Sequence, residues 1–106
     1  MTDAPGVLSL SGTADRFTVK QIKLTGRERS VLRYIDWNMG TKGIELLDCT
    51  KLEPEDLVDV LNGLMDVGYV EMAPYAEHTD LAGFREKTFE VNPGYALELR
   101  SAMRHA

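Results

Sequence analysis

The stretch EPEDLVDVLNGLMDVGYV, residues 53–70, decides the fold of this chain. Pro54 suits the first turn of a helix, because the N–H that proline lacks would have no partner there. Gly68 stands where a helix end needs a residue that accepts a positive φ. Between them, apolar residues recur with the spacing of one helical face, at Leu57, Val60, Leu61, Leu64 and Met65. The pattern predicts a helix with one buried face that ends just before Gly68.

The opposite half of this predicted helix is polar and mostly acidic. Residues 52–84 contain eight acidic residues and no Lys or Arg. Residues 16–33 have the opposite balance, with six basic residues against Glu28 alone. Such an asymmetry bears on the partners of a protein rather than on its fold. The two charged segments are either binding surfaces or ordinary solvated faces, and the sequence leaves both interpretations open.

Length and composition bound the class of protein. At 106 residues, 43% of them hydrophobic, the chain predicts one domain with a modest core. The single cysteine, Cys49, excludes an internal disulfide framework and fits a reducing compartment. We expect it to be a small packed side chain rather than a nucleophile. No apolar run reaches the roughly 18–20 residues of a membrane span, and residues 1–7 lack a signal-peptide pattern. The sequence therefore predicts a soluble, cytoplasmic protein.

The N-terminal part of the chain divides into an arm and an extension. Residues 1–15 are small and polar, which predicts a flexible arm and leaves residues 16–106 as a single domain. Residues 16–24, RFTVKQIKL, alternate between apolar and polar types with one change of register, which is a strand signal. We therefore expect a strand-like extension ahead of the first helix, suited to dimerisation or partner binding.

Two helices are predicted before the central one. Thr25 and Glu28 form a capping box, in which each side chain accepts a hydrogen bond from the other residue's N–H. The helix that follows is expected to continue to residues 39–40, with Trp37 plugging the core at its end. Residues 40–43, GTKG, predict a turn, and residues 44–50 a short second helix. The expected inward residues are Val31, Leu32 and Ile35, then Ile44 and Leu47, with Leu46 or Cys49 at the edge.

A β-hairpin and a last helix are predicted after residue 68. Residues 69–72 alternate and then meet Pro74, which favours a short or edge strand. Residues 73–87 have the composition of a loop or hairpin tip, and residues 88–91 resume the alternation and can pair antiparallel with 69–72. Asn92 followed by Pro93 predicts a helix start. The inner stripe of that last helix is expected to be Tyr95, Leu99 and Met103.

This order of elements resembles a winged helix-turn-helix domain. Residues 45–52 resemble the second helix and turn of that motif, and residues 57–70 its third helix and exit into the wing. Residues 89–95, FEVNPGY, resemble the passage from wing to C-terminal helix in bacterial regulators of the MarR and related groups. The resemblance covers residues 24–103 and suits a bacterial source. It implies an α+β fold with a three-helix core, a two- to three-stranded β-wing, an N-terminal strand-like extension and a C-terminal helix.

The third helix of this resemblance bears directly on DNA binding. In DNA-binding members that helix lies in the major groove. Carried over to this chain, the groove contacts fall to Glu53, Glu55, Asp56, Asp59 and Asn62. Neutralisation of phosphates by Lys and Arg supplies most non-specific affinity for DNA, and carboxylates oppose it. The third helix therefore departs from the DNA-binding pattern.

Two functions follow from these observations. The first is a non-catalytic interaction module, a protein–protein adaptor or regulator, whose partner is an unknown protein or a second copy bound head to tail. Its predicted binding face comprises Glu55, Asp56, Asp59, Asn62 and Asp66. The alternative is a DNA-binding transcription regulator that docks through its wing and basic stretch, whose charges a dimer would double. The basic residues concerned are Arg85 and Lys87 in the wing, and Lys20, Lys23, Arg27, Arg29 and Arg33.

An enzyme or metal protein is the third class considered, and the sequence disfavours it. Residues 77–80, EHTD, hold the only cluster of a histidine with carboxylates. Zinc sites use three or four ligands in which Cys or His is prominent, and this segment is interpreted as exposed polar sequence. A Gly-rich phosphate loop and a Ser/His/Asp arrangement are both missing from the sequence. We therefore predict no catalytic residue, no cofactor and no metal.

Overall fold

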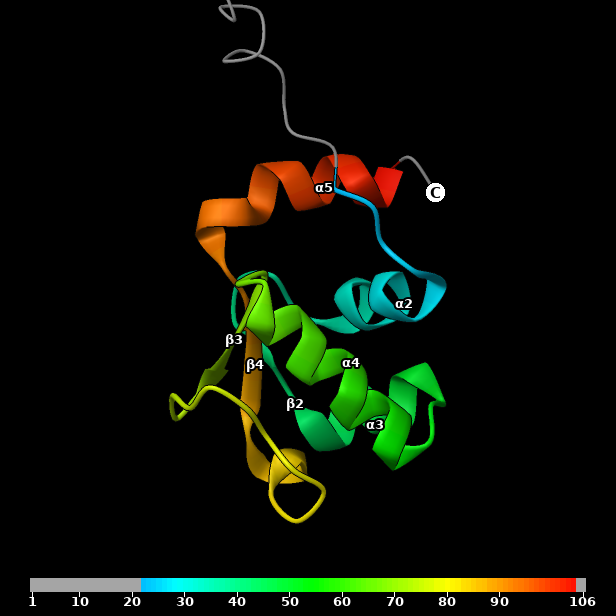
Figure 1. Ribbon diagram of the computed structural model, residues 1–106, viewed down its shortest axis with the longest axis vertical. Helices are drawn as coiled ribbons and strands as arrows, with labels where there is room; N and C mark the ends of the chain where they lie inside the picture. The colour runs from blue at the N-terminus through cyan, green and yellow to red at the C-terminus, as the bar shows by residue number, and fades with distance from the viewer. Residues whose placement is uncertain (1–21, 105–106) are drawn as a thin grey trace, which may run out of the picture.

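Helix α4 (Pro54–Asp66) crosses the middle of the computed structural model, which describes residues 22–104 (Figure 1). Its buried side chains are Leu57, Val58, Leu61 and Leu64. Beyond the helix, Gly68 has a φ of +86° and turns the chain away from the helix axis. The Tyr69 N–H then donates to the Leu64 carbonyl oxygen at 2.9 Å. The predicted start and end of this helix are confirmed, and its buried face is confirmed at Leu57, Leu61 and Leu64. Val60 and Met65 are half-buried and pack against the core.

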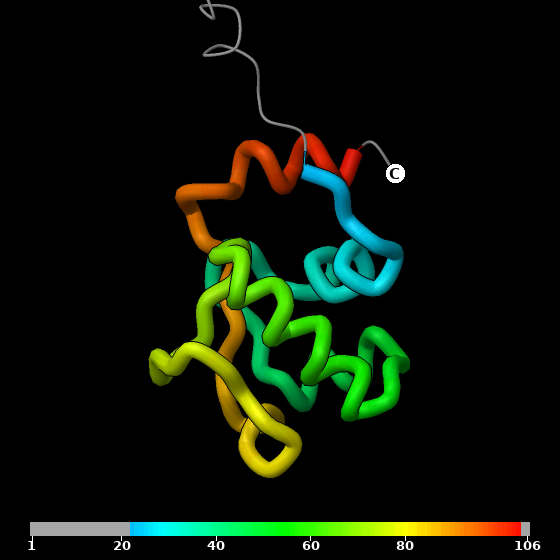
Figure 2. The backbone as a smooth tube through the Cα atoms, in the orientation of Figure 1, coloured from blue at the N-terminus to red at the C-terminus, as the bar shows by residue number. Residues whose placement is uncertain are grey.

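The other elements pack around α4, and the tube in Figure 2 traces them from blue to red. In chain order they are α2 (Gly26–Tyr34), β2 (Thr41–Lys42), α3 (Gly43–Thr50), β3 (Val70–Ala73), the 3-10 turn η1 (Phe84–Glu86), β4 (Thr88–Val91), the 3-10 turn η2 (Pro93–Tyr95) and α5 (Ala96–Arg104). Within residues 22–104 the fold is therefore α+β, with four α-helices and one three-stranded antiparallel sheet. This layout is compatible with the winged-helix expectation.

The three strands pair in the order β2-β4-β3. Val70 of β3 lies opposite Val91 of β4, in an antiparallel register that confirms the predicted hairpin. The apolar side chains of both strands are buried, whereas Glu71 and Glu90 are exposed on the other face. β3 is an edge strand, as Pro74 indicated. One face of the sheet therefore packs against the core, and the other face carries exposed carboxylates.

Helix α2 begins with the predicted capping box, in which both hydrogen bonds are present. The Glu28 N–H donates to Thr25 Oγ1 at 3.1 Å, and the Thr25 N–H donates to Glu28 Oε1 at 2.8 Å. Beyond the other end of the helix, the Trp37 indole N–H donates to the Leu32 carbonyl oxygen at 2.9 Å. The Trp37 ring is partly buried against the core, so its predicted role as a plug is confirmed.

Helix α2 ends at Tyr34, earlier than the predicted residues 39–40. The Asp36 carboxylate accepts from the N–H groups of Asn38 and Met39, which folds this segment into a turn and holds the Asp36 pKa below its usual value. The Asp36 N–H donates to Oγ1 of the buried Thr41 at 2.8 Å. The predicted turn at residues 40–43 is also wrong, because this anchoring lets residues 41–42 pair with β4 as strand β2.

Helix α3 is rotated about its axis relative to the prediction. Leu46 is fully buried, whereas Ile44 is 45% exposed and Cys49 is exposed. The rotation follows from Gly43, the first residue of the helix, whose backbone lies directly against the Phe84 carbonyl group. The expected inward position of Ile44, the edge position of Leu46 and the packed position of Cys49 are therefore wrong.

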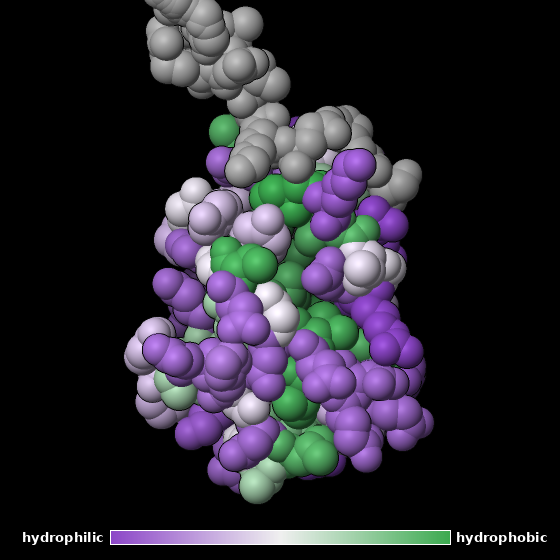
Figure 3. Space-filling model, in the orientation of Figure 1, coloured by the Kyte–Doolittle hydropathy of each residue, from purple (hydrophilic) through white to green (hydrophobic). Residues whose placement is uncertain are grey.

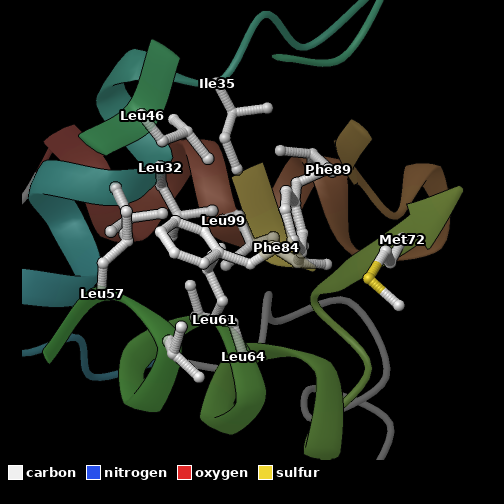
Figure 4. Packing of buried hydrophobic residues seen from close by; sticks show 14 residues of the cluster. Leu32, Ile35, Leu46, Leu57, Leu61, Leu64, Met72, Phe84, Phe89 and Leu99 are labelled. Atoms are coloured by element: carbon white, nitrogen blue, oxygen red, sulfur yellow. The ribbon is translucent and has the colours of Figure 1, made fainter. Parts of the chain in front are cut away.

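Phe84 lies at the centre of the core, although the sequence around it has the composition of a loop. Figure 4 shows its ring among Leu32 of α2 and Leu57 and Leu61 of α4. All four side chains are fully buried. A single aromatic residue in a polar segment produces no periodicity, so no sequence pattern marked it. The connection between β3 and β4 is therefore tied into the helical core.

The chain enters α5 at the predicted cap. The Asn92 side-chain oxygen accepts from the N–H two residues later at 2.9 Å. Leu99 is fully buried and Met103 packs against the core, as predicted. Tyr95 lies in η2 rather than on the helix, is 38% exposed, and packs edge-on against Tyr69 with ring centroids 5.1 Å apart. Its expected place on the inner stripe is therefore wrong, because α5 begins one residue later.

The predicted arm at residues 1–15 and most of the predicted strand-like extension at residues 16–24 lie outside the described residues. The part of the extension that is described belongs to no helix or strand. There, Ile22 and Leu24 are half-buried against the helical core. Residues 22–24 thus add core contacts ahead of α2.

We expect Gly43→Ala to destabilise the fold by about 1–3 kcal/mol, the range for overpacked sites. The new methyl group would clash with the Phe84 carbonyl oxygen, and this clash can be relieved only if the backbone of η1 moves. Gly63→Ala is the matched control, because its new Cβ meets no atom within 4 Å on the exposed side of α4. That change should stabilise the fold by about 0.4–1 kcal/mol. Urea unfolding measures both variants, and equal midpoints would contradict the packing described.

Candidate functional site

The exposed side of α4 carries a stripe of four polar residues, which we call the α4 stripe. They are Glu55, Asp59, Asn62 and Asp66. Their spacing of i, i+4, i+7 and i+11 places them on one side of the helix. The three carboxylate residues are exposed and Asn62 is half-buried. Because α4 contains no Lys or Arg, the stripe presents negative charge that its own helix does not neutralise.

The loop of residues 74–83 covers the C-terminal half of the α4 stripe. Asn62 Nδ2 donates to the Thr79 carbonyl oxygen at 3.1 Å, and Asn62 Oδ1 accepts from the Thr79 N–H at 2.8 Å. One turn further on, His78 Nε2 lies 2.6 Å from Asp66 Oδ1. Two residues of the predicted acidic face are therefore engaged within the chain.

Asp56, at the edge of the stripe, is also engaged. Its Oδ2 lies 3.6 Å from Nη2 of Arg27, which projects from α2. Among residues 22–104, Glu55 and Asp59 form no ion pair. Within residues 22–104, these two carboxylates, one helical turn apart, are the part of the predicted acidic face that remains available to a partner.

The predicted basic residues are divided between two parts of the molecule. Helix α2 carries Arg27, Arg29 and Arg33. The η1 turn contains Arg85, and Lys87 directly follows it. Figure 1 places α2 in the upper half of the view and the η1 segment at its lower end. Lys23 is exposed just before α2, and Lys20 lies outside the described residues. The two groups do not form one continuous basic surface within residues 22–104.

Arg85 is directed at its own loop. Its guanidinium carbon lies 4.9 Å from the centroid of the Phe84 ring. Its Nη1 donates to the Leu81 carbonyl oxygen at 3.4 Å. The bond to the carbonyl uses an N–H donor that a phosphate would otherwise bind, and the aromatic contact holds the guanidinium against the loop. The predicted wing cation is therefore partly occupied by contacts within the chain.

Two basic residues that the sequence interpretation missed lie on α5. Arg100 and Arg104 are four residues apart and exposed, so they share the outer side of the helix. The guanidinium carbon of Arg100 lies 5.2 Å from the centroid of the Trp37 ring. A helical wheel drawn with Leu99 inward would have placed both arginines outward. They add positive charge to the end of the molecule that holds α2 (Figure 1).

A cavity of about 340 Å³ lies between the end of α4, β3 and the loop. Three acidic residues line it, Asp66, Glu71 and Glu77, and no Lys or Arg does. Within residues 22–104, no three His, Cys, Asp or Glu side chains are arranged to hold a metal ion. The cavity therefore lies at the C-terminal end of α4, whereas Glu55 and Asp59 lie in its N-terminal half, and it provides no metal ligand set among these residues.

The side of the molecule that carries α4 and the loop is mainly hydrophilic. In Figure 3 purple residues cover most of this side, with green hydrophobic patches between them. A charged surface of this kind recognises partners mainly by complementary charge, which sets specificity and rate of association. We therefore regard the α4 stripe as the candidate binding surface.

Comparisons with protein-family models, with curated proteins and with solved structures find no match to this chain. Among the described helices, none has the length and apolar character needed to cross a membrane.

We expect Asn62→Ala to release the loop from α4. The change removes both hydrogen bonds to Thr79, and leaving such partners unpaired costs about 1–3 kcal/mol. Hydrogen exchange at the Thr79 amide should become roughly tenfold to a hundredfold faster. Asp59→Ala is the control on the same stripe, since Asp59 has no hydrogen bond or ion pair to the loop. Unchanged exchange at Thr79 in the Asn62 variant would contradict the clamp.

Proposed function

We propose that this protein is a non-catalytic interaction module with a winged-helix layout, which binds a basic protein surface through the α4 stripe. The observation that carries the proposal is the charge of α4. Glu55 and Asp59 are exposed, form no ion pair within residues 22–104, and share their helix with no cation. Such a surface attracts cationic groups and repels phosphate. A cytoplasmic location, which the single cysteine favours, belongs to the same proposal.

The order of elements supports the winged-helix layout. α2, β2, α3, α4 and the β3–β4 hairpin follow one another as that motif requires, and β2 joins the hairpin as a third strand. Helix α3 ends at Thr50, and the next residue, Lys51, has a φ of +62° that redirects the chain toward α4. In this layout α4 corresponds to the helix that DNA-binding members insert into the major groove.

Electrostatics favour a protein partner over DNA for such a helix. A duplex placed against α4 would meet Glu55 and Asp59. The cations needed to offset them lie at separate places on α2 and near η1. DNA binding through the wing and basic stretch is the alternative function, and it would require both groups to reach one duplex.

The chemistry of the proposed contact is that of exposed ion pairs. Carboxylates accept charge-assisted hydrogen bonds from Lys and Arg. Each exposed pair contributes only about 0.2–1 kcal/mol, so the affinity should be modest. Screening at physiological salt acts over about 8 Å, so binding should weaken as salt rises.

We would titrate the protein with a fluorescent helical peptide that carries lysines four residues apart on an alanine background. Wild type should bind it at low salt and release it at high salt. Glu55→Lys combined with Asp59→Lys should weaken binding by on the order of tenfold, because two attractions become repulsions. Fluorescence anisotropy measures both.

The matched control is Glu71→Lys combined with Glu90→Lys. It changes the net charge by the same amount on the exposed face of the sheet and should weaken binding clearly less. Equal losses in the two double variants would reduce the effect to net charge and contradict a defined site on α4. Salt-sensitive binding of wild type to mixed-sequence duplex DNA would favour the alternative function instead.

A further inference from the structure

We propose that the basic surface recognised by the α4 stripe belongs to a second copy of this chain. The contact joins Arg29 and Arg33 on α2 of one copy to Glu55 and Asp59 on α4 of the other. This inference rests on the proposed function and names its partner. Of the charged residues on α2 and α4, the contact uses only these four. Arg27, Asp56 and Asp66 are left out because they already have partners within the chain.

The two surfaces match in spacing. Arg29 and Arg33 are four residues apart on α2, and Glu55 and Asp59 are four residues apart on α4. Side chains at this spacing lie about 5–6 Å apart on one side of a helix. Arg33 is exposed and Arg29 is half-buried, and neither forms an ion pair among residues 22–104. Two helices placed against each other can therefore form two ion pairs at once.

The same groups cannot pair within one chain. Arg27 reaches Asp56, which shows that its side of α2 faces α4. At 100° per residue, Arg33 and Arg29 lie roughly 120° and 160° around the α2 axis from Arg27. Their side of α2 therefore points away from α4, so Glu55 and Asp59 of the same chain do not face it.

The distribution of charge favours a head-to-tail approach. Residues 22–39 and 93–104, which include α2 and α5, contain six basic and three acidic residues. Residues 40–92 contain four basic and twelve acidic residues. In Figure 1, α5 and α2 lie in the upper part of the molecule, α3, the loop and η1 in the lower part, and α4 runs between them. Charge segregated in this way orients two copies so that the basic end of one meets the acidic side of the other.

Apolar side chains accompany both charged surfaces. Tyr34 follows Arg33 on α2 and is 44% exposed. On α3, which is separated from α4 by three residues, Ile44 and Leu47 line an open groove. Aromatic residues commonly anchor protein interfaces. The proposed contact therefore includes some apolar surface as well as the ion pairs.

Sedimentation velocity of the full chain over a range of concentrations tests this contact. At low salt, wild type should form dimers and larger species as concentration rises, because the contact joins two different surfaces and leaves one of each kind open. At about 0.5 M salt, where charges are screened within a few ångströms, it should be a monomer. A wild type that stays monomeric at low salt would overturn the inference.

Charge reversal locates the contact. Glu55→Lys with Asp59→Lys, and Arg29→Glu with Arg33→Glu, should each be monomeric at concentrations where wild type associates. An equimolar mixture of the two variants should regain association, since each restores the opposite charge for the other. Glu71→Lys with Glu90→Lys should associate like wild type. If the α2 double variant does not fold, Arg33→Glu at its exposed position takes its place.

Self-association that survives both reversals, or a mixture that stays monomeric, would also overturn the inference. The lysine peptide separates this failure from failure of the proposed function. Monomeric wild type that still binds the peptide through Glu55 and Asp59 would leave the interaction module in place with a different basic partner. Loss of peptide binding together with salt-sensitive DNA binding would overturn both proposals.

Discussion

The insertion of Phe84 between the helices is the contact on which the rest of this structure depends. Its ring is fully buried among leucines of α2 and α4, and its carbonyl lies against Gly43, so one residue fixes both the rotation of α3 and the end of the β3–β4 connection. Asn62 holds that connection a few residues earlier, at Thr79. The loop is therefore drawn along α4 and covers half of the α4 stripe.

This arrangement sorts the charges of α4 into engaged and available ones. Asp66 pairs with the loop and Asp56 pairs with α2, whereas Glu55 and Asp59 form no ion pair with either. The core packing thus affects the surface. The buried Phe84 ring fixes the position of the loop, and the loop determines which carboxylates are accessible to a partner. An exposed helix with this charge suits a cationic protein surface and opposes a polyanion. We infer that function in this chain depends on the sign of the charge that the helix presents.

Local patterns in the sequence were sufficient to predict the elements and their order. The apolar spacing of α4, the capping box at Thr25, the β3–β4 hairpin and the cap at Asn92 each depend on residues close together in the chain, and all four are confirmed. Contacts between distant residues produced the errors. The rotation of α3 depends on Phe84, and the state of the acidic face depends on an Asn62–Thr79 contact across 17 positions. The sequence identifies the acidic residues of the predicted face. It does not indicate which of them form contacts within the chain.

The most direct test of this account is the affinity for mixed-sequence duplex DNA at low salt, measured for wild type beside Glu55→Lys with Asp59→Lys. If the available carboxylates of α4 are what opposes a duplex, wild type should not bind, and the variant should gain weak, salt-sensitive binding because phosphates then meet lysines. The sheet variant with the same net charge, Glu71→Lys with Glu90→Lys, should gain less. Wild type that binds DNA as well as the variant does would contradict the account.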